Sequence, residues 1–219
     1  NMLADGFEVG TSNANITVEQ VTGWKFYLNE IDLDIEPEGE NITISIQQKG
    51  NSPSNPIISH TIQGWNVSIE QITFKMDPGQ IAQFTLNITP PNEGFAGEVG
   101  ILNLRARDTD DSGLREATIP LRIAAIHDLQ FNIEGEWIIS ENGGFPLAWI
   151  ENNGNGISYV TVSIEGLPEN WTIDGASDFA IAPGQKRGLE LELIPSDWDG
   201  IPVRVEIIIA TQEGMVISN

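Results

Sequence analysis

The sequence contains no cysteine and few basic residues. The first absence excludes disulfide bonds, thiolate metal sites and cysteine nucleophiles. Ten Lys and Arg residues stand against 32 Asp and Glu residues, which gives a formal net charge of −22. A surface of this sign repels nucleic acid and anionic lipid, so neither is an expected partner. The acidic residues are dispersed rather than clustered, which is typical of charge that keeps a surface soluble.

Long apolar runs are also missing. No run reaches 18 residues, and the first residues show no signal-peptide pattern. The sequence therefore predicts no membrane span, and it is consistent with a processed chain or a piece of a longer one. Asn-x-Ser/Thr sequons favour an extracellular or cell-surface location and are candidate glycosylation sites. The five sequons begin at Asn15, Asn41, Asn66, Asn87 and Asn170.

An internal repeat organises the chain. A tryptophan, a Pro-Gly-Gln turn, a strand ending in proline and a Gly-Asn pair each occur twice, 104 to 106 residues apart. A period of about a hundred residues belongs to whole domains rather than to solenoid units. The matched positions are Trp65 and Trp171, Pro78 and Pro183, Pro90 and Pro195, and Gly50-Asn51 and Gly154-Asn155.

Apolar residues alternate with polar ones in nearly every ordered-looking segment. Residues 84–88 read FTLNI and residues 189–193 read LELEL, and such a period of two indicates half-buried strands. Turn residues recur at intervals near ten, and no window shows a helical stripe. The sequence therefore predicts an all-β protein made of two tandem immunoglobulin-like antiparallel β-sandwiches with about seven strands each.

The repeat places three parts in order. Residues 1–23 are an N-terminal extension, residues 24–125 form the first sandwich, and residues 126–219 form the second. No Pro, Gly or Ser linker separates the sandwiches. Because short connections without flexible residues restrict the angle between domains, we expect a stiff rod.

Both ends of the chain depart from a self-contained pair. The second sandwich has room for only a short final strand after Gly214, and the extension contains a spare alternating segment from Ile16 to Val21. Two explanations stay open. The sequence can be a piece of a longer multidomain protein, in which residues 1–23 are the tail of a preceding domain. Alternatively, a spare strand from one copy completes the next copy.

Residues 127–219 carry a family resemblance. The order of alternating strand, NNGNG, strand, GLPENWT, APGQ, LELELIP and DWDG resembles Ig-like modules of bacterial and archaeal surface proteins. The most similar are the NEW-type domain associated with alpha-galactosidases and the CARDB-like cell-adhesion modules. Residues 24–125 resemble them more loosely, since QGWN replaces LPENW. The resemblance implies a noncatalytic extracellular spacer or adhesion module and brings no catalytic residues.

Catalytic chemistry has little to build on. His60 and His127 occupy nonequivalent positions and have no nearby partner in the sequence for a catalytic triad or a metal site. Paired carboxylates can work as acid and base, but they need a cleft, which a small filled sandwich seldom offers. The sequence therefore favours a protein that is not an enzyme.

One acidic loop has calcium-ligand character. Oxygen-bearing side chains precede Gly113 in the loop RDTDDSGLRE, as in the first half of a calcium-binding loop, but no bidentate Glu follows. A solvated hairpin turn is the other interpretation, because Asp and Gly are favoured there. Calcium is the only cofactor that the sequence suggests. The candidate ligands are Asp108, Asp110, Asp111 and Ser112.

The tryptophans divide by position. Trp65 and Trp171 recur in register, so we expect them to close the ends of the two cores. Trp149 lies in a strand whose apolar neighbours disagree about the buried face. It is the candidate for stacking on a sugar.

The leading hypothesis is a noncatalytic spacer or adhesion module of a larger surface or secreted protein. Its expected partners are neighbouring domains of the same protein or other surface proteins. One alternative is a carbohydrate-binding accessory module of a surface glycoside hydrolase, with a polysaccharide partner. Another is a filament subunit assembled by strand donation.

Overall fold

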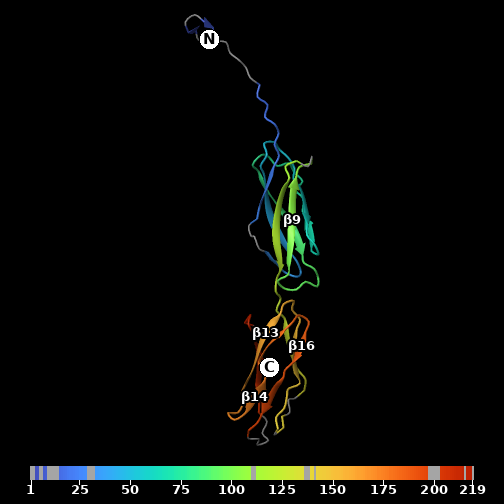
Figure 1. Cartoon of the computed structure of the whole chain (residues 1–219), viewed down its shortest axis with the longest axis vertical. Coiled ribbons are helices and arrows are strands. Elements are labelled where there is room, and N and C mark those ends of the chain that lie inside the picture. The colour runs from blue at the N-terminus through green and yellow to red at the C-terminus, as the bar shows by residue number, and fades with distance from the viewer. Residues whose placement is uncertain are drawn as a thin grey trace.

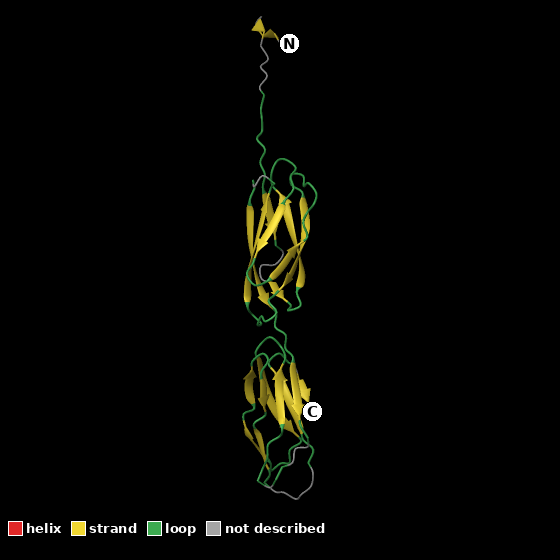
Figure 2. Ribbon diagram, turned by 90° about the vertical axis from the view of Figure 1, so that its right-hand side faces the viewer, coloured by secondary structure: helices red, strands yellow, loops and turns green. Residues whose placement is uncertain are grey.

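Two β-sandwiches lie end to end in the computed structural model, and an N-terminal segment extends from the far end of the first (Figure 1). The structure describes residues 3–4, 7–8, 15–28, 33–109, 112–135, 139–140, 142–196, 203–214 and 216–218. These residues form strands, turns and loops but no helix (Figure 2). Within the same residues, no helix could therefore cross a membrane.

The first sandwich consists of two four-stranded sheets. Its pairings are antiparallel except between β4 and the end of β10, which run parallel. One sheet has the order β3 (Trp24–Tyr27), β5 (Glu40–Gln48), β8 (Ile81–Thr89), β7 (Asn66–Ile69). The other has the order β4 (Leu33–Ile35), β10 (Arg115–Ile123), β9 (Val99–Arg107), β6 (Ile57–Thr61).

The second sandwich repeats much of this arrangement. One layer contains the sheet β11 (Leu129–Ile133), β12 (Ala148–Asn152), β16 (Lys186–Gly188) and the pair β14 (Thr172–Gly175), β17 (Leu191–Ile194). The other has the order β15 (Asp178–Ile181), β13 (Ser158–Glu165), β18 (Glu206–Thr211), β19 (Val216–Ser218). Because β18 lies between β13 and β19 as β9 lies between β6 and β10, the sequence repeat is also a repeat of topology. The predicted fold class is confirmed.

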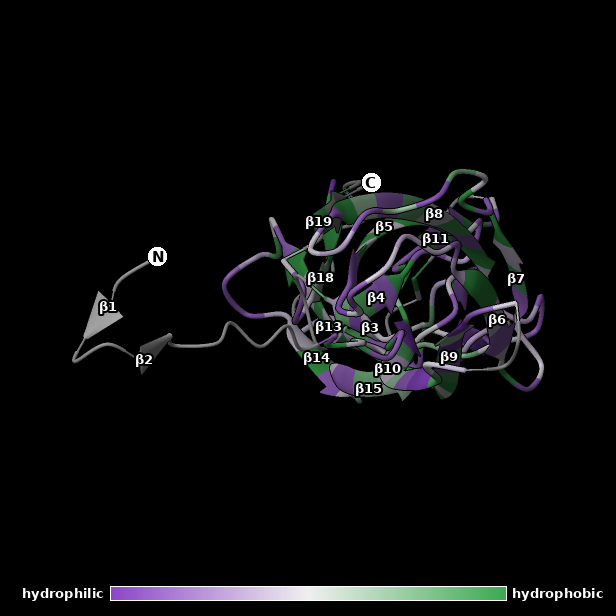
Figure 3. Ribbon diagram, turned by 90° about the horizontal axis from the view of Figure 1, so that it is seen from above, coloured by the Kyte–Doolittle hydropathy of each residue, from purple (hydrophilic) through white to green (hydrophobic). Residues whose placement is uncertain are grey.

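Strand alternation builds each core. In β8, Ala82, Phe84, Leu86 and Ile88 are buried while the residues between them face outward or lie half-buried. The second core is built in the same way, from alternate residues of its own strands. Seen from above, the labelled strands of both sandwiches fall within one rounded outline (Figure 3). Two further short strands, β1 (Leu3–Ala4) and β2 (Phe7–Glu8), pair with each other near the N-terminus.

The tryptophans only partly occupy the predicted places. Trp24 is a core residue, and Trp65 is half-buried against the first core, where a Cβ on Gly100 would overlap its indole ring. Trp171 is half-buried and does not belong to the second core cluster. Of the two matched tryptophans, Trp65 therefore packs against its core, as expected. Trp137 and Trp198 lie outside the described residues.

Two residues of β9 test this assignment of core and surface. Leu104 is 0% exposed, whereas Ile101 is 49% exposed on the opposite face of the same strand. We expect Leu104→Ala to lower the free energy of unfolding of the first sandwich by about 2–5 kcal/mol, because it removes packed methyl groups and leaves a cavity. We expect Ile101→Ala to change it by about 0.5 kcal/mol or less. Urea denaturation measures both, and equal losses would contradict the assignment.

Candidate functional site

A buried side-chain amide ends one strand of each sandwich. Gln48 ends β5 and Asn152 ends β12, and both side chains are fully buried. Gln48 Nε2 donates to the Ser52 carbonyl at 2.7 Å, and Asn152 Nδ2 donates to the Gly156 carbonyl at 2.8 Å. The side-chain oxygen of each amide accepts from a glycine N–H two residues later. The amide therefore fixes the shape of the loop that follows its strand.

The repeated Pro-Gly-Gln turn holds the backbone of the same amide residue. Gly184 N–H donates to the Asn152 carbonyl at 2.8 Å, and Asn152 N–H donates to the Gln185 carbonyl at 3.0 Å. Gly79 and Gln80 make the matching bonds to Gln48. Gly79 and Gly184 both have positive φ. A type II turn requires positive φ at its third residue, where glycine is favoured. The turn that recurs in the sequence therefore supports the amide, and the amide supports the loop.

The loop after β12 also holds the linker between the sandwiches, which is residues 124–128 between β10 and β11. Asn155 Oδ1 accepts from Ile126 N–H at 2.7 Å, and Asn155 Nδ2 donates to the Ala124 carbonyl at 2.9 Å. Asn155 N–H donates to the Ile126 carbonyl at 3.2 Å. We call these three hydrogen bonds the lower clamp. One asparagine thereby pairs backbone groups of the linker that no strand partner would satisfy.

Gly154 lets the linker approach this loop. A Cβ on Gly154 would overlap the Ile126 carbonyl oxygen, so no other residue fits without moving the backbone. The requirement is a close approach of two chain segments, since Gly154 is not among the glycines with positive φ.

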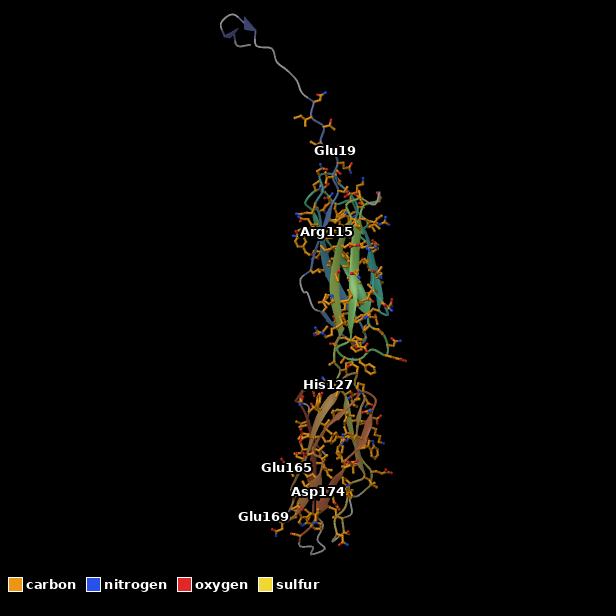
Figure 4. All side chains as sticks on the ribbon, viewed as in Figure 1. Glu19, Arg115, His127, Glu165, Glu169 and Asp174 are labelled. Atoms are coloured by element: carbon orange, nitrogen blue, oxygen red, sulfur yellow. The ribbon has the colours of Figure 1, made fainter. Side chains whose placement is uncertain are left out.

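The lower clamp also joins the two sandwiches directly. Ala96, in the loop between β8 and β9, donates its N–H to the Asn155 carbonyl at 3.0 Å. A Cβ on Gly156 would lie 3.3 Å from the Ala96 Cβ, so the two loops are in close contact. His127 lies between the sandwiches, whereas Glu19 lies at the opposite end of the first (Figure 4). The loop after β12 therefore contacts both the linker and the first sandwich.

The predicted calcium loop is only partly described. Asp108 is buried, its Oδ1 accepts from Thr109 N–H at 3.0 Å, and its own N–H donates to the Ser112 carbonyl at 2.9 Å. Ser112 Oγ lies 2.7 Å from Thr22 Oγ1. Asp110 and Asp111 lie outside the described residues. Within the described part of the chain, no three His, Asp or Glu side chains gather as metal ligands would.

The candidate sugar-stacking residue has one ring face covered. Trp149 is half-buried on β12, and Lys186 Nζ lies 3.6 Å from the centroid of its ring. This cation–π contact is with the face on which a sugar would stack. Lys186 is brought there by pairing of β16 with β12, in which Glu151 lies opposite Lys186. A sugar would have to displace the lysine or use the other face.

The two histidines lie in different parts of the described chain. His60 lies in β6 opposite Leu104, far along the chain from His127 in the linker. The pKa of Asp178 is lowered, chiefly by the hydroxyl of Thr161, which donates to the carboxylate at 2.6 Å, and also by Ser177. This exposed carboxylate joins two strands by an ordinary cross-strand contact.

Each of the five sequon asparagines is exposed. Asn41 and Asn87 lie opposite each other on β5 and β8, and Asn87 Nδ2 donates to Asn41 Oδ1 at 3.0 Å. Ser68, the hydroxyl residue of the Asn66 sequon, lies opposite Asn87 from β7. Three sequons therefore share the outer face of one sheet. Their glycosylation stays a prediction.

The clamp itself was not predicted from the sequence. The Gly-Asn pair was visible as a repeated position, but its partners lie 29 and 31 residues away along the chain. A usable signal was the pairing of a repeated glycine with a repeated asparagine directly after an amide-ended strand. Turn formation explains Gly and Asn equally well, so the pattern alone did not distinguish the two roles.

No family model and no curated protein matches the sequence. Similar solved structures include a YadV chaperone, with 13% identity over 90% of this chain and 97% of that chain and a TM-score of 0.33. Others are the E. coli chaperone DraB (14%, 90% and 95%, 0.32) and the D00-D0 domain of intimin (12%, 89% and 96%, 0.37). With TM-scores below 0.5, these likenesses carry no argument about function. The fold rests on the strand pairing described above.

An isosteric substitution tests the lower clamp. In Asn155→Asp the donor to the Ala124 carbonyl becomes a second carboxylate oxygen, which repels that carbonyl. We expect the free energy of unfolding of the second sandwich to fall by about 1–3 kcal/mol and the Ile126 amide to exchange faster. Asn153→Asp, at an exposed neighbour, adds the same charge and is the control. Equal effects of the two substitutions on exchange at Ile126 would contradict the clamp.

The loss in Asn155→Asp is expected to depend on pH. Contact with the Ala124 carbonyl favours the protonated carboxyl, so its pKa is raised in the folded state. The donor is therefore restored below about pH 4, and it is lost again as the pH rises through the folded-state pKa. Denaturant titrations of both variants at low and neutral pH measure the difference. A loss that does not shrink in acid would contradict the proposed contact.

Gly154→Ala tests the close approach. The added methyl group must displace the Ile126 carbonyl, so we expect the second sandwich to lose about 1–3 kcal/mol and the Ile126 amide to lose protection. Gly188→Ala is the matched control, because a Cβ there meets its closest atom at 3.9 Å. Amide exchange and urea denaturation distinguish the two.

Proposed function

We propose that this chain is a noncatalytic spacer in a larger extracellular or cell-surface protein, one that holds neighbouring domains at a fixed separation and orientation. The observation that carries the proposal is the lower clamp. If the linker made contacts with only one sandwich, the other sandwich would be free to change its orientation. Here one loop binds the linker and, through Ala96, the preceding sandwich.

The position of the two connections supports the same role. The chain enters the first sandwich at the end near Glu19 and leaves it at the end near His127 (Figure 4). Entry and exit at opposite ends add the length of each sandwich to the whole, as a spacer requires. Entry and exit at the same end would instead fold neighbouring units back on each other.

The surface composition fits an exposed position outside the cell. A formal net charge of −22 keeps extended molecules apart from one another, and all five sequon asparagines are accessible. Membership among the NEW-type or CARDB-like modules is part of this proposal and rests on the motifs quoted above. A sugar-binding role has less support, because Lys186 covers one face of the Trp149 ring.

Distance measurements between equivalent positions test the spacer. Ser59 on β6 and Ser163 on β13 are exposed and occupy matching places in the two sandwiches. Since the chain has no cysteine, Ser59→Cys and Ser163→Cys in one protein can be spin-labelled at these two sites alone. Electron–electron double resonance measures the distance between the two labels. We expect one narrow distance distribution for a spacer.

Two comparisons make the experiment decisive. Adding Asn155→Asp should broaden the distribution, whereas adding Asn153→Asp should leave its width unchanged. A broad distribution in the protein with an intact lower clamp would overturn the spacer proposal. Binding of the same protein to immobilised polysaccharides, abolished by Trp149→Ala, would favour the carbohydrate-binding alternative.

A further inference from the structure

Asn51 makes the same hydrogen bonds at the opposite end of the first sandwich. Asn51 Oδ1 accepts from Val21 N–H at 2.8 Å, and Asn51 Nδ2 donates to the Glu19 carbonyl at 2.8 Å. Asn51 N–H donates to the Val21 carbonyl at 2.9 Å. We call these three bonds the upper clamp. Atom for atom, they match the bonds of Asn155 in the lower clamp.

The surroundings of the upper clamp match as well. A Cβ on Gly50 would overlap the Val21 carbonyl oxygen, as one on Gly154 would overlap that of Ile126. Lys49 N–H donates to the Gly23 carbonyl at 2.7 Å, and Asn153 N–H donates to the Asp128 carbonyl at 2.7 Å. The incoming chain is therefore held as a linker is held.

This match fixes the register of the N-terminal segment. With Val21 in the place of Ile126, Ile16 takes the place of Leu121 and Val18 that of Ile123, which end strand β10. Leu121 is 0% exposed and Ile123 is 2% exposed. Ile16 is 86% exposed and Val18 is 75% exposed. The segment carries the apolar alternation of a final core strand, but no core covers it in this chain.

The strands that precede the segment complete the pattern. β1 pairs antiparallel with β2, with Ala4 opposite Phe7 and only Asp5-Gly6 between them in the sequence. β9 with β10 and β18 with β19 are the corresponding hairpins of the two sandwiches. In each of the three connections a glycine stands directly before an apolar residue: Gly6-Phe7, Gly113-Leu114 and Gly214-Met215. Gly6 stands ten residues before Ile16, whereas Gly113 stands eight residues before Leu121, so the N-terminal part has two more residues than β10 at this place.

We propose that β1, β2 and residues 15–21 belong to the end of a third sandwich of the same kind, and that the end of the first sandwich around Asn51 is the docking surface for it. The inference rests on the proposed spacer function, and it names the partner. The third sandwich lies on the upper clamp as the first lies on the lower clamp. Its loop corresponding to Ala96 donates an N–H to the Asn51 carbonyl.

Side-chain exposure at the two clamps agrees with this partner. Asn155 is half-buried and Gly156 is buried where the first sandwich contacts them, whereas Asn51 is exposed and Ser52 is half-buried at the equivalent places. The difference is what removal of one neighbouring sandwich produces. Val21 is 57% exposed, against 37% for Ile126 at the corresponding linker position.

Strand donation between copies is the competing explanation for the exposed segment. In that arrangement residues 16–18 of one copy would extend the sheet of the second sandwich of another. The second sandwich already has β18 as the partner of its final strand. The pair β1–β2 lies before the segment in the same chain, with two residues between the two strands in the sequence. A segment that follows a paired strand in its own chain fits a covalently preceding sandwich better than a donated strand.

A fusion protein tests the inference. Residues 24–120 are placed directly before residues 16–219, so that Ile16 and Val18 take the places of Leu121 and Ile123 in the added sandwich. We expect three folded sandwiches, in which the amides of residues 16 and 18 exchange at least tenfold more slowly than in the present chain, because they enter a sheet. Exchange at the present rate would overturn the inference.

Two variants of the fusion separate core packing from clamping. Ile16→Asp with Val18→Asp places charges at core positions and should unfold the added sandwich, while the other two stay folded. Asn51→Asp in the original first sandwich should leave all three sandwiches folded. It should broaden the distribution of distances between spin labels at position 59 of the added sandwich and position 59 of the original one. Asn153→Asp in the same fusion is the charge control. An added sandwich indifferent to the double substitution would contradict the register.

The outcomes distinguish this inference from the spacer proposal. Narrow distances across the lower joint with free exchange at residues 16 and 18 would leave the spacer standing and reject the third sandwich. Burial of residues 16 and 18 with a broad distribution at the lower joint would do the reverse. If the present chain assembles into concentration-dependent polymers that Ile16→Asp abolishes, strand donation replaces the covalent third sandwich.

Discussion

The joint between the sandwiches depends on a side-chain amide that is buried where a strand ends. At that position backbone groups turn away from the sheet and lose their ladder partners, and a buried unpaired group is costly. An amide supplies a donor and an acceptor from one planar group, whereas a carboxylate only accepts. Gln48 and Asn152 use both, so that the loop after each strand has one shape. Asn51 and Asn155 are presented to the linker by that loop.

The hydrogen bonds described above that hold the linker are between neutral groups. This matters in a chain whose formal net charge is −22, because a joint built on ion pairs would weaken with salt and would compete with the surrounding carboxylates. Hydrogen bonds from an asparagine are not screened in this way. The described ion pairs Arg105–Glu116 and Arg122–Asp34 lie instead on the exposed sheet of the first sandwich. The described ion pairs therefore lie on the surface, whereas amide side chains and glycines make the contacts at the joint.

The sequence predicted what depends on local alternation and missed what depends on distant partners. The strand at residues 84–88 follows from its period of two, because one face of that strand is buried by any sandwich. The partners of Asn155 could not be read in this way, since Ala124 and Ile126 reach it only through the topology. The contact of Lys186 with Trp149 could not be read from the sequence for the same reason, because Lys186 reaches the ring through a strand pairing. Repetition of the Gly-Asn pair was the one local sign of a shared role.

The two clamps hold their linkers by the same atoms but differ in the side chains around them, and this difference bears on the shape of a longer array. Gly156 faces Ala96 closely at the lower joint, whereas the equivalent residue near the upper clamp is Ser52. A hydroxymethyl group in that place needs space that the lower joint does not have. A third sandwich must therefore tilt or move away from Ser52 while its linker stays bound to Asn51. In the proposed array, the backbone contacts shared by the two clamps thus hold each linker, while the exchanged small side chains set a different angle at each joint.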